Sequence, residues 1–158
     1  MFNGNKPSLQ AKTNADAVRS GENQISLLII EDALIHSTII GHIAEKVGFT
    51  TATARSYEDA CEILSARQFD CITLDLGLGD HVGLDVLHYL HATRCRAQII
   101  IISLSDKKVC DEMVQIGKAL DLNIDSSVHK PLDLKALRET LEQIRIRAQL
   151  QKLTVSPL

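Results

Sequence analysis

The chain has 158 residues, of which 45% are hydrophobic and 3% aromatic, and its formal net charge is −3. This length suits one domain with tails, whose core must be aliphatic because tryptophan is absent. The acidity gives no reason to expect nucleic-acid binding, the apolar runs are too short to cross a membrane, and the N-terminus lacks the apolar region of a signal peptide.

The first part of the chain predicts a flexible arm followed by a strand and a helix. Residues 1–24 are polar with little apolar periodicity. Ser26–Ile30 is a short apolar run, typical of a strand buried on both faces of a parallel sheet. A helix ending at Gly48 is expected next, from apolar residues at spacings of four: Ile35, Ile39, Ile43 and Val47.

Four more pairs of strand and helix follow. The later strands are predicted at Thr50–Ala54, Asp70–Asp75, Gln98–Ser103 and Ile124–His129. Ser56 with Asp59 predicts the start of the second helix, and Asp133 that of the last. The remaining apolar stripes are Leu84, Leu87 and Leu90 on the third helix, Val109, Met113, Ile116 and Leu120 on the fourth, and Leu134, Leu137, Leu141 and Ile144 on the last.

This fivefold alternation predicts an α/β fold, a doubly wound five-stranded parallel sheet with helices on both faces. The domain is expected over residues 25–151. Residues 152–158 are expected to form a C-terminal tail with no output domain after it. In such sheets the ligand site lies beyond the carboxyl ends of the strands, where the strand order reverses.

Polar residues stand at four of these strand ends. Glu31 and Asp32 follow the first strand, Asp75 ends the third, Ser103 ends the fourth and Lys130 follows the fifth. Three neighbouring carboxylates repel one another and need a cation, and all-oxygen ligation favours Mg²⁺. A carboxylate beside such an ion can attack a phosphoryl group, whose oxygens a lysine and a hydroxyl would stabilise. Taken singly, each residue has an ordinary explanation as a cap, turn or surface residue; the combination favours phosphoryl chemistry.

These motifs resemble those of the response-regulator receiver family, from about Ser26 to Ala148. The resemblance lies in the acidic pair Glu31-Asp32, the stretch CITLDLGLGDHVGLDVL, the strand IIIIS and the HKP sequence. It implies the flavodoxin-like (βα)5 receiver fold and a cis Lys130-Pro131 bond. It also implies a phospho-acceptor, Asp75, with Lys130 and Ser103 contacting the phosphoryl group. The Mg²⁺ ligands would be Glu31, Asp32, Asp75 and the backbone carbonyl of Gly77.

Three features depart from the usual receiver pattern. Gly79 replaces a proline four residues after the acceptor, which predicts a looser loop. Ser127 replaces the aromatic switch residue. The segment between Ser103 and Lys130 is several residues longer than in chemotaxis-type receivers, and Gly117–Asp125 is the expected place of the extension.

The cysteines and histidines are expected to be structural. The four cysteines lie far apart without C-x-x-C spacing, so free thiols in a reducing cytoplasm are expected: Cys61, Cys71, Cys95 and Cys110. His88 and His91 have a spacing that permits a metal pair but lack nearby carboxylates, which favours a polar helix face. His129 is expected to point away from the site, because strand neighbours alternate.

The leading hypothesis is a non-enzymatic switch of a two-component system. Its expected partners are a sensor histidine kinase or phosphotransfer protein and a downstream protein, with a homodimer also open. An alternative is the receiver part of a longer regulator, for example one with a cyclic-di-GMP phosphodiesterase output. An aspartyl-phosphate hydrolase would need a second Asp at Gly77, and a flavin carrier would need hydroxyls where Glu31 and Asp32 stand.

Overall fold

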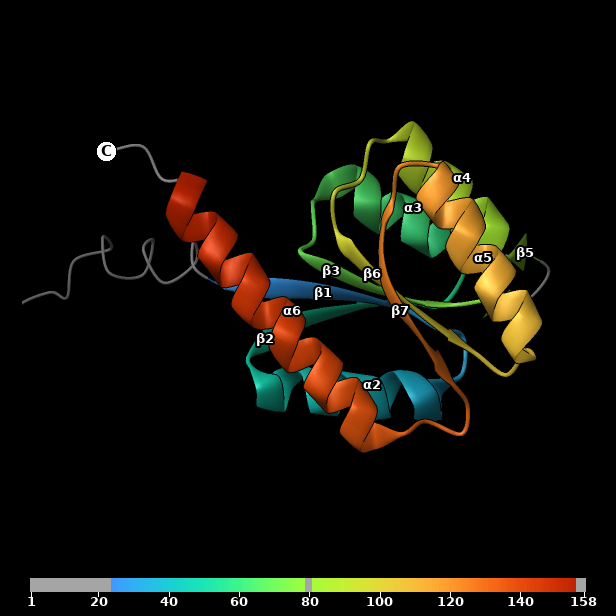
Figure 1. The fold of residues 1–158 in the computed structure, drawn as a ribbon, viewed down its shortest axis with the longest axis horizontal. Coiled ribbons are helices and arrows are strands. Elements are labelled where there is room, and N and C mark those ends of the chain that lie inside the picture. Colours follow the sequence, from blue (N-terminus) through green and yellow to red (C-terminus); the bar gives the residue numbers. More distant parts are fainter. Residues whose placement is uncertain (1–23, 79–80, 156–158) are drawn as a thin grey trace, which may run out of the picture.

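A computed structural model describes residues 24–78 and 81–155. It contains a five-stranded parallel sheet of order β2-β1-β3-β6-β7, with helices on both faces (Figure 1). The strands are β1 (Ile25–Ile30), β2 (Phe49–Ala54), β3 (Cys71–Asp75), β6 (Gln98–Ser103) and β7 (Asn123–His129). The helices are α2 (Leu34–Val47), α3 (Tyr57–Ala66), α4 (Gly83–Ala92), α5 (Lys107–Ala119) and α6 (Leu134–Val155). The predicted doubly wound sheet is confirmed; the predicted N-terminal arm and Gly79 lie outside the described residues.

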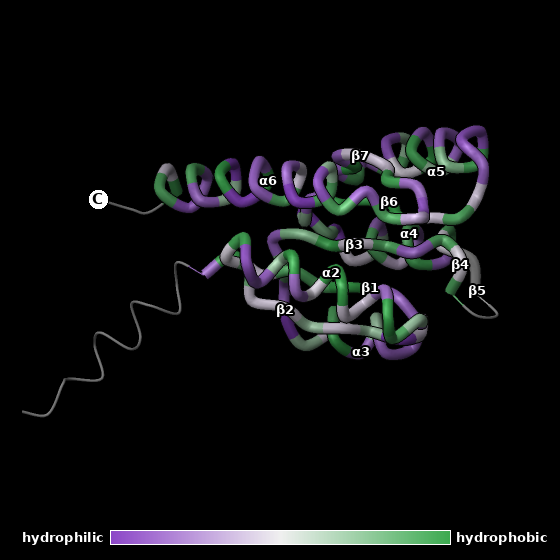
Figure 2. The backbone as a smooth tube through the Cα atoms, turned by 90° about the horizontal axis from the view of Figure 1, so that it is seen from below, coloured by the Kyte–Doolittle hydropathy of each residue, from purple (hydrophilic) through white to green (hydrophobic). Residues whose placement is uncertain are grey.

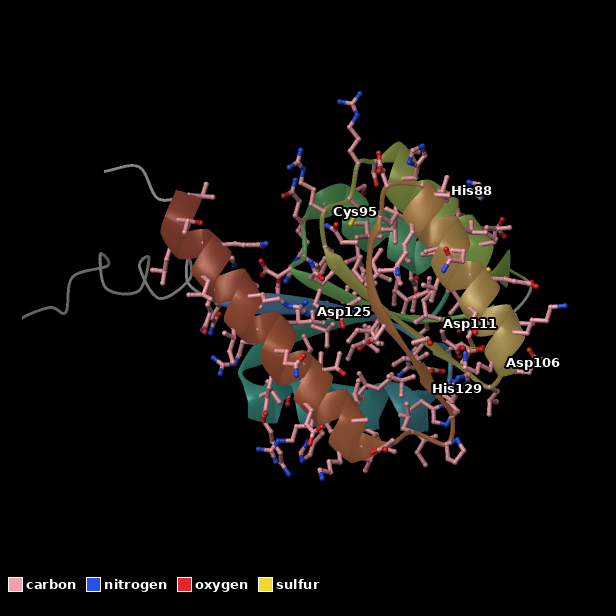
Figure 3. All side chains as sticks on the ribbon, in the orientation of Figure 1. His88, Cys95, Asp106, Asp111, Asp125 and His129 are labelled. Atoms are coloured by element: carbon pink, nitrogen blue, oxygen red, sulfur yellow. The ribbon has the colours of Figure 1, made fainter. Side chains whose placement is uncertain are left out.

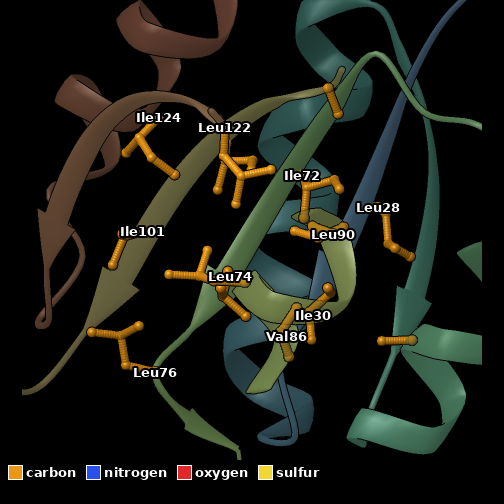
Figure 4. Packing of buried hydrophobic residues seen from close by; sticks show 14 of the residues in the cluster. Leu28, Ile30, Ile72, Leu74, Leu76, Val86, Leu90, Ile101, Leu122 and Ile124 are labelled. Atoms are coloured by element: carbon orange, nitrogen blue, oxygen red, sulfur yellow. The ribbon is translucent and has the colours of Figure 1, made fainter. Parts of the chain in front are cut away.

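Alternate residues of each strand enter two separate aliphatic cores. Leu28 and Ile30 of β1 pack in one core with residues of α3, α4 and α5. Figure 4 shows both beside Val86 and Leu90 of α4. Leu27 and Ile29 pack in the other core, with residues of α2 and α6. All four side chains are at most 1% exposed. A strand with a core on each face must be apolar at every position, which is why its sequence is a continuous apolar run.

The predicted helix caps at Gly48, Ser56 and Asp133 are present, and the structure also has a cap at Asp106. The backbone N–H of Gly48, whose φ of 106° suits glycine, donates to the carbonyls of Ala44 and Glu45. Ser56 Oγ accepts from the N–H of Asp59, which starts α3. Asp106 and Asp133 accept in the same way at the starts of α5 and α6. Local sequence therefore sets where these helices begin and end.

The predicted buried faces of three helices need correction. On α6, Leu134 is 49% exposed, whereas the rest of its predicted stripe is buried. On α2, Ile35 is 68% exposed, whereas Ile40, which was not in the predicted row, is buried. Val109 is 40% exposed, and the neighbouring Cys110 is buried on α5. Four residues turn a helix by about 400°, so a row at spacings of four drifts about 40° per step and leaves the core at its ends. The helix α6 also continues past the predicted end at Gln151, to Val155.

Two short features were not predicted. Gly77–Leu78 (β4) and His81–Val82 (β5) form an antiparallel pair just after Asp75. In β7 the register against β6 shifts, because Ile99 pairs with Ile124 whereas Ile100 pairs with Ser126. Asp125 is the unpaired residue of this bulge, and its side chain binds Arg147 of α6. The bulge lies inside the segment predicted to be extended.

A close contact between α5 and β7 predicts the effect of enlarging Gly117. A Cβ atom there would lie 2.7 Å from Cδ1 of Ile124. Gly117→Ala should therefore lower the free energy of unfolding by about 1–3 kcal/mol, measured by urea denaturation. Gly41→Ala in α2 is the matched control, because its Cβ would make an ordinary 3.6 Å contact with Ile29. It should raise stability by up to about 1 kcal/mol. Equal stabilities of the two variants would contradict the close packing.

Candidate functional site

The residues predicted from the strand ends come together in one pocket of about 210 Å³. It lies at the carboxyl ends of β1 and β3, the point where the strand order reverses. Its lining includes every predicted site residue, together with four others: Glu31, Asp32, Asp75, Gly77, Ser103 and Lys130, with Ala33, His36, Leu104 and Ser105. The fold thus gathers side chains that are up to 99 positions apart in the chain.

Lys130 lies between two of the three carboxylates. Its Nζ donates to Glu31 Oε2 at 2.8 Å and to Asp75 Oδ2 at 2.9 Å. The Lys130 side chain is only 4% exposed. Burial lowers the pKa of Lys130, but its hydrogen bonds and charge interactions with Glu31 and Asp75 outweigh burial and raise it overall. The lysine is therefore held as an ammonium beside Asp75.

Backbone N–H groups hold the other oxygens of the same two carboxylates. Glu31 Oε1 accepts from the N–H of Ala33 at 3.1 Å, and Asp75 Oδ1 accepts from the N–H of Gly77 at 3.0 Å. Burial nevertheless raises the pKa of Glu31, more than its bond to Lys130 lowers it. These bonds fix both carboxylates without using a side chain that could compete for a ligand.

Asp32 completes a candidate metal centre. Oxygens of Glu31, Asp32 and Asp75 lie within 4.8 Å of one another. Asp32 is exposed, and it forms no hydrogen bond or ion pair with any residue that the structure describes. An all-oxygen set with one solvent-facing carboxylate fits Mg²⁺, which keeps several waters. The expected repulsion among three carboxylates is thus partly relieved by Lys130, and Asp32 alone lacks a cation.

Ser103 connects the pocket to α5 and β7. Its hydroxyl oxygen accepts from the N–H of Ser105 at 2.9 Å, and its carbonyl accepts from the N–H of Lys130 at 2.9 Å. Two residues after Ser103, the carbonyl of Ser105 lies 3.8 Å from Sγ of the buried Cys110. Figure 3 shows Asp106 at the start of α5 and His129 at the end of β7, at the same end of the sheet. Movement of the Ser103 hydroxyl would therefore act directly on the start of α5.

Four residues that line the pocket were not among the predicted site residues, and two of them have side chains that matter for the site. His36 lies in the first turn of α2 with Nδ1 3.6 Å from Glu31 Oε1. Leu104, which is 76% exposed, lies on the pocket wall. Neither residue belongs to a recognisable sequence motif. Each lies in the pocket because of the direction in which the chain leaves the preceding strand. A histidine one turn beyond an acidic pair was the only available signal.

Several smaller predictions can be compared with the structure. The Lys130-Pro131 peptide bond is cis, as the resemblance implied. All four cysteines are free, and burial strongly raises the pKa of Cys71. His88 and His91 are exposed on α4, and His91 Nδ1 lies 2.7 Å from the carbonyl oxygen of Leu120. His129 is not part of the pocket lining. Within the described residues, no helix is both long enough and apolar enough to span a membrane.

The family model of the response regulator receiver domain matches residues 27–142. The chain belongs to the response regulator receiver family. Receiver domains bind Mg²⁺ at an acidic site, and the structure of this receiver contains an acidic cluster of Glu31, Asp32 and Asp75. The receiver is therefore a component of two-component signalling.

Curated relatives of this receiver include two transcriptional regulatory proteins. It is 30% identical over 121 residues to ZraR of Salmonella typhimurium, covering 76% of this chain and 26% of ZraR. It is 36% identical over 118 residues to DcuR of Escherichia coli K12, covering 73% of this chain and 47% of DcuR. This receiver thus spans about a quarter and about half of these relatives' lengths. Neither is a phosphodiesterase, so the proposed cyclic-di-GMP output gains no support from them.

Solved structures share the fold of this receiver at lower identity. The receiver domain of a putative Luxo repressor protein from Vibrio parahaemolyticus has a TM-score of 0.70 and 20% identity, covering 85% of this chain and 99% of that one. A CheY-like receiver from Methanospirillum hungatei has a TM-score of 0.70 and 16% identity, covering 81% and 98%. A response regulator from Burkholderia pseudomallei, solved with a phosphorylated aspartic acid and a calcium ion, has a TM-score of 0.63 and 18% identity, covering 85% and 76%.

Proposed function

We propose that Asp75 accepts a phosphoryl group and that this modification switches a protein-interaction surface. The observation that carries the proposal is the position of Lys130 Nζ, 2.9 Å from Asp75 Oδ2 and 2.8 Å from Glu31 Oε2 in a pocket open to solvent. An ammonium beside the acceptor stabilises the negative charge of the transferring group. Ser103, in the same pocket, would donate its hydroxyl to a phosphoryl oxygen.

Mg²⁺ is the proposed cofactor. Asp32 would supply the solvent-facing ligand, with Glu31, Asp75 and the carbonyl of Gly77 completing the protein part of the set. The ion would neutralise charge on the phosphoryl oxygens. The bonds from the N–H groups of Ala33 and Gly77 leave Glu31 and Asp75 with lone pairs to spare, because a carboxylate oxygen accepts more than one bond.

The proposed donor is a sensor histidine kinase or a phosphotransfer protein in the cytoplasm, and the output acts through a downstream protein. The transcriptional regulatory relatives favour a role in controlling transcription, with this receiver as part of a longer regulator or as a partner of one. Gly77 stands where an aspartyl-phosphate hydrolase needs its general acid, which argues against an enzyme. The acidic charge still favours a chain that itself makes no nucleic-acid contact.

Phosphoryl transfer tests the proposal directly. Incubation with acetyl phosphate and Mg²⁺ should add the mass of one phosphoryl group to the intact protein, and EDTA should prevent the addition. Peptide mapping should place the group on Asp75. Steady release of phosphate at enzymatic rates, without a persistent phosphoprotein, would instead favour the hydrolase.

We further predict that the signal leaves the site through the loop after Ser103. No ring is available at Ser127, so movement of Ser103 should act on Ser105 and on the cap at Asp106. Hydrogen exchange on the free and beryllofluoride-bound protein should show its largest protection changes between Leu104 and about Ile116. A change concentrated in β7, with Leu104–Ile116 constant, would contradict this route.

A further inference from the structure

Another hollow of the structure, the amino-end hollow, has a volume of about 360 Å³ and lies at the amino ends of β3 and β6. It is bounded by the loop between α3 and β3, the loop between α4 and β6, and one side of α6. Its floor is apolar, because Phe69, Ala97 and Ala148 are buried there. Figure 3 shows Cys95, which also lines it, at the end of the sheet away from His129. A hollow of this size with an apolar floor and polar groups at its rim is typical of a small-molecule site.

Three arginines stand on the rim of the amino-end hollow without a carboxylate partner. Arg67, Arg94 and Arg96 are all exposed, and none forms an ion pair with a carboxylate in residues 24–78 and 81–155. On α6, in contrast, Arg138 and Arg147 each pair with a carboxylate. A free guanidinium group binds a phosphate or carboxylate through two parallel hydrogen bonds. Three such groups at one hollow, in a chain whose net charge is −3, favour an anionic ligand.

Asp70, the only acidic residue among the described lining residues of this hollow, does not oppose an anion. Its carboxylate accepts from the N–H and the hydroxyl of Ser26, at 2.8 Å and 3.1 Å. It also accepts from Nζ of Lys152 at 3.1 Å. The negative charge of Asp70 is therefore offset by the ammonium beside it, and the rim keeps the positive charge of the three arginines.

Arg94 holds a backbone conformation that an arginine does not favour. Its φ is 54°, in the left-handed region just after α4. The N–H of Arg94 donates to the carbonyl of His91 at 3.0 Å, and the N–H of Cys95 donates to that of Leu90 at 2.9 Å. This pair of bonds ends a helix with glycine as the preferred residue, because a side chain is disfavoured there. Strain of this kind indicates that the Arg94 side chain is kept for a purpose other than the fold.

Arg67 offers a flat surface at the same rim. Its guanidinium carbon lies 4.3 Å from the centroid of the Phe69 ring, so one face of the guanidinium group is stacked. Because Arg67 is exposed, the other face can stack on a planar ring of a ligand. The amides of Gln68, Gln98 and Gln151 on the lining can both donate and accept hydrogen bonds. Gln151 stands on α6, along which Figure 2 shows hydrophobic and hydrophilic turns alternating, so this helix contributes to both floor and rim.

We propose that the amino-end hollow binds a nucleoside phosphate. The phosphate would accept hydrogen bonds from the guanidinium groups of Arg94 and Arg96. The base would stack on the open face of Arg67, with the lining amides at its polar edge. The hollow shares no lining residue with the pocket around Asp75, so this site does not depend on phosphoryl transfer to that residue.

Isothermal titration calorimetry of the full chain in EDTA tests the ligand class, with AMP, GMP, CMP and UMP as probes. EDTA prevents Mg²⁺ from linking a phosphate to the acidic pocket. At least one nucleotide should bind at a single site. Its nucleoside and ribose 5-phosphate should each bind about tenfold or more weakly, because each lacks one of the two groups that the hollow contacts. Failure of all four nucleotides to bind at millimolar concentration, or a nucleoside or ribose 5-phosphate as tight as the nucleotide, would overturn the proposal.

Substitution of a rim arginine tests the location of the site. Arg96→Gln should weaken binding of the nucleotide about tenfold or more, because a charge-assisted contact with the phosphate is lost. Arg55→Gln is the matched control: it removes the same charge from an exposed position after β2, at the other end of the sheet, and should bind like wild type. Equal affinities of these two variants would contradict binding in the hollow.

Two substitutions of Arg94 separate binding from folding. Arg94→Gly suits the left-handed backbone, so this variant should melt no lower than wild type, yet it should bind the nucleotide about tenfold or more weakly. Arg94→Ala loses the same side chain but keeps the strained backbone, so it should bind as weakly and melt below Arg94→Gly. An Arg94→Gly variant that binds like wild type would show that the strained arginine has no part in the site, and would overturn the proposal.

Discussion

The Asp75→Asn variant should gain no phosphoryl group from acetyl phosphate and Mg²⁺, a loss of at least about 10³-fold relative to wild type. An amide is a poor nucleophile, whereas the Asp75 carboxylate stands beside the Lys130 ammonium and the oxygens of Glu31 and Asp32. Intact-protein mass spectrometry over time measures the loss. The variant should remain folded, because the side-chain oxygen of asparagine can still accept from Lys130.

Asp70→Asn is the control for this experiment. Asp70 precedes the same strand at the opposite end, where its carboxylate accepts from the N–H and hydroxyl of Ser26. This variant should be phosphorylated like wild type. A phosphoryl mass that persists in Asp75→Asn but disappears in Asp70→Asn would show that the acceptor lies at the other end of the sheet.

The Lys130→Met variant should be less stable than wild type by about 3 kcal/mol in EDTA at neutral pH. The substitution removes the ammonium that pairs with Glu31 and Asp75, which are 1% and 8% exposed, and leaves two buried carboxylates facing each other. Urea denaturation measures the difference. Asp32→Asn is the matched comparison, because Asp32 is exposed and lies outside the Lys130 ion pairs. Its stability in EDTA should equal or exceed that of wild type, while the rise in melting temperature caused by Mg²⁺ should be lost.

The loss of stability caused by Lys130→Met should become smaller as pH falls. Burial already raises the pKa of Glu31 above its ordinary 4.5, and loss of Lys130 removes the main interaction that lowers it. A carboxyl with a raised pKa in the folded state stabilises the fold when protonated. The contribution of such a carboxyl to stability is therefore greatest below its pKa in the unfolded chain. It is lost as pH rises through its pKa in the folded protein. The variant should gain stability relative to wild type as pH falls from 7 toward 5. A pH-independent defect would indicate lost packing instead.

The sequence alone determined the class of fold and which residues gather in the pocket. Continuous apolar runs such as Ile99–Ile102 predict strands with a core on each face, and the caps at Ser56, Asp106 and Asp133 set helix starts through local hydrogen bonds. Parallel strands present their carboxyl ends at one edge. For that reason, polar residues at the ends of four strands were sufficient to predict the pocket.

Only the tertiary structure decided which carboxylates pair with the Lys130 ammonium and which helix faces remain exposed. Lys130 lies 99 positions from Glu31, and whether its ammonium pairs with Glu31, Asp75 or Asp32 depends on how β7 is positioned across the sheet. His36 enters the pocket because of the direction in which α2 leaves β1. The spacing of Ile146, Leu150 and Leu153 can be read from the sequence, but spacing alone does not show whether an apolar stripe packs against its own domain. The packing of Leu137, Leu141 and Ile144 against the sheet decided which stripe of α6 is buried and left the other exposed.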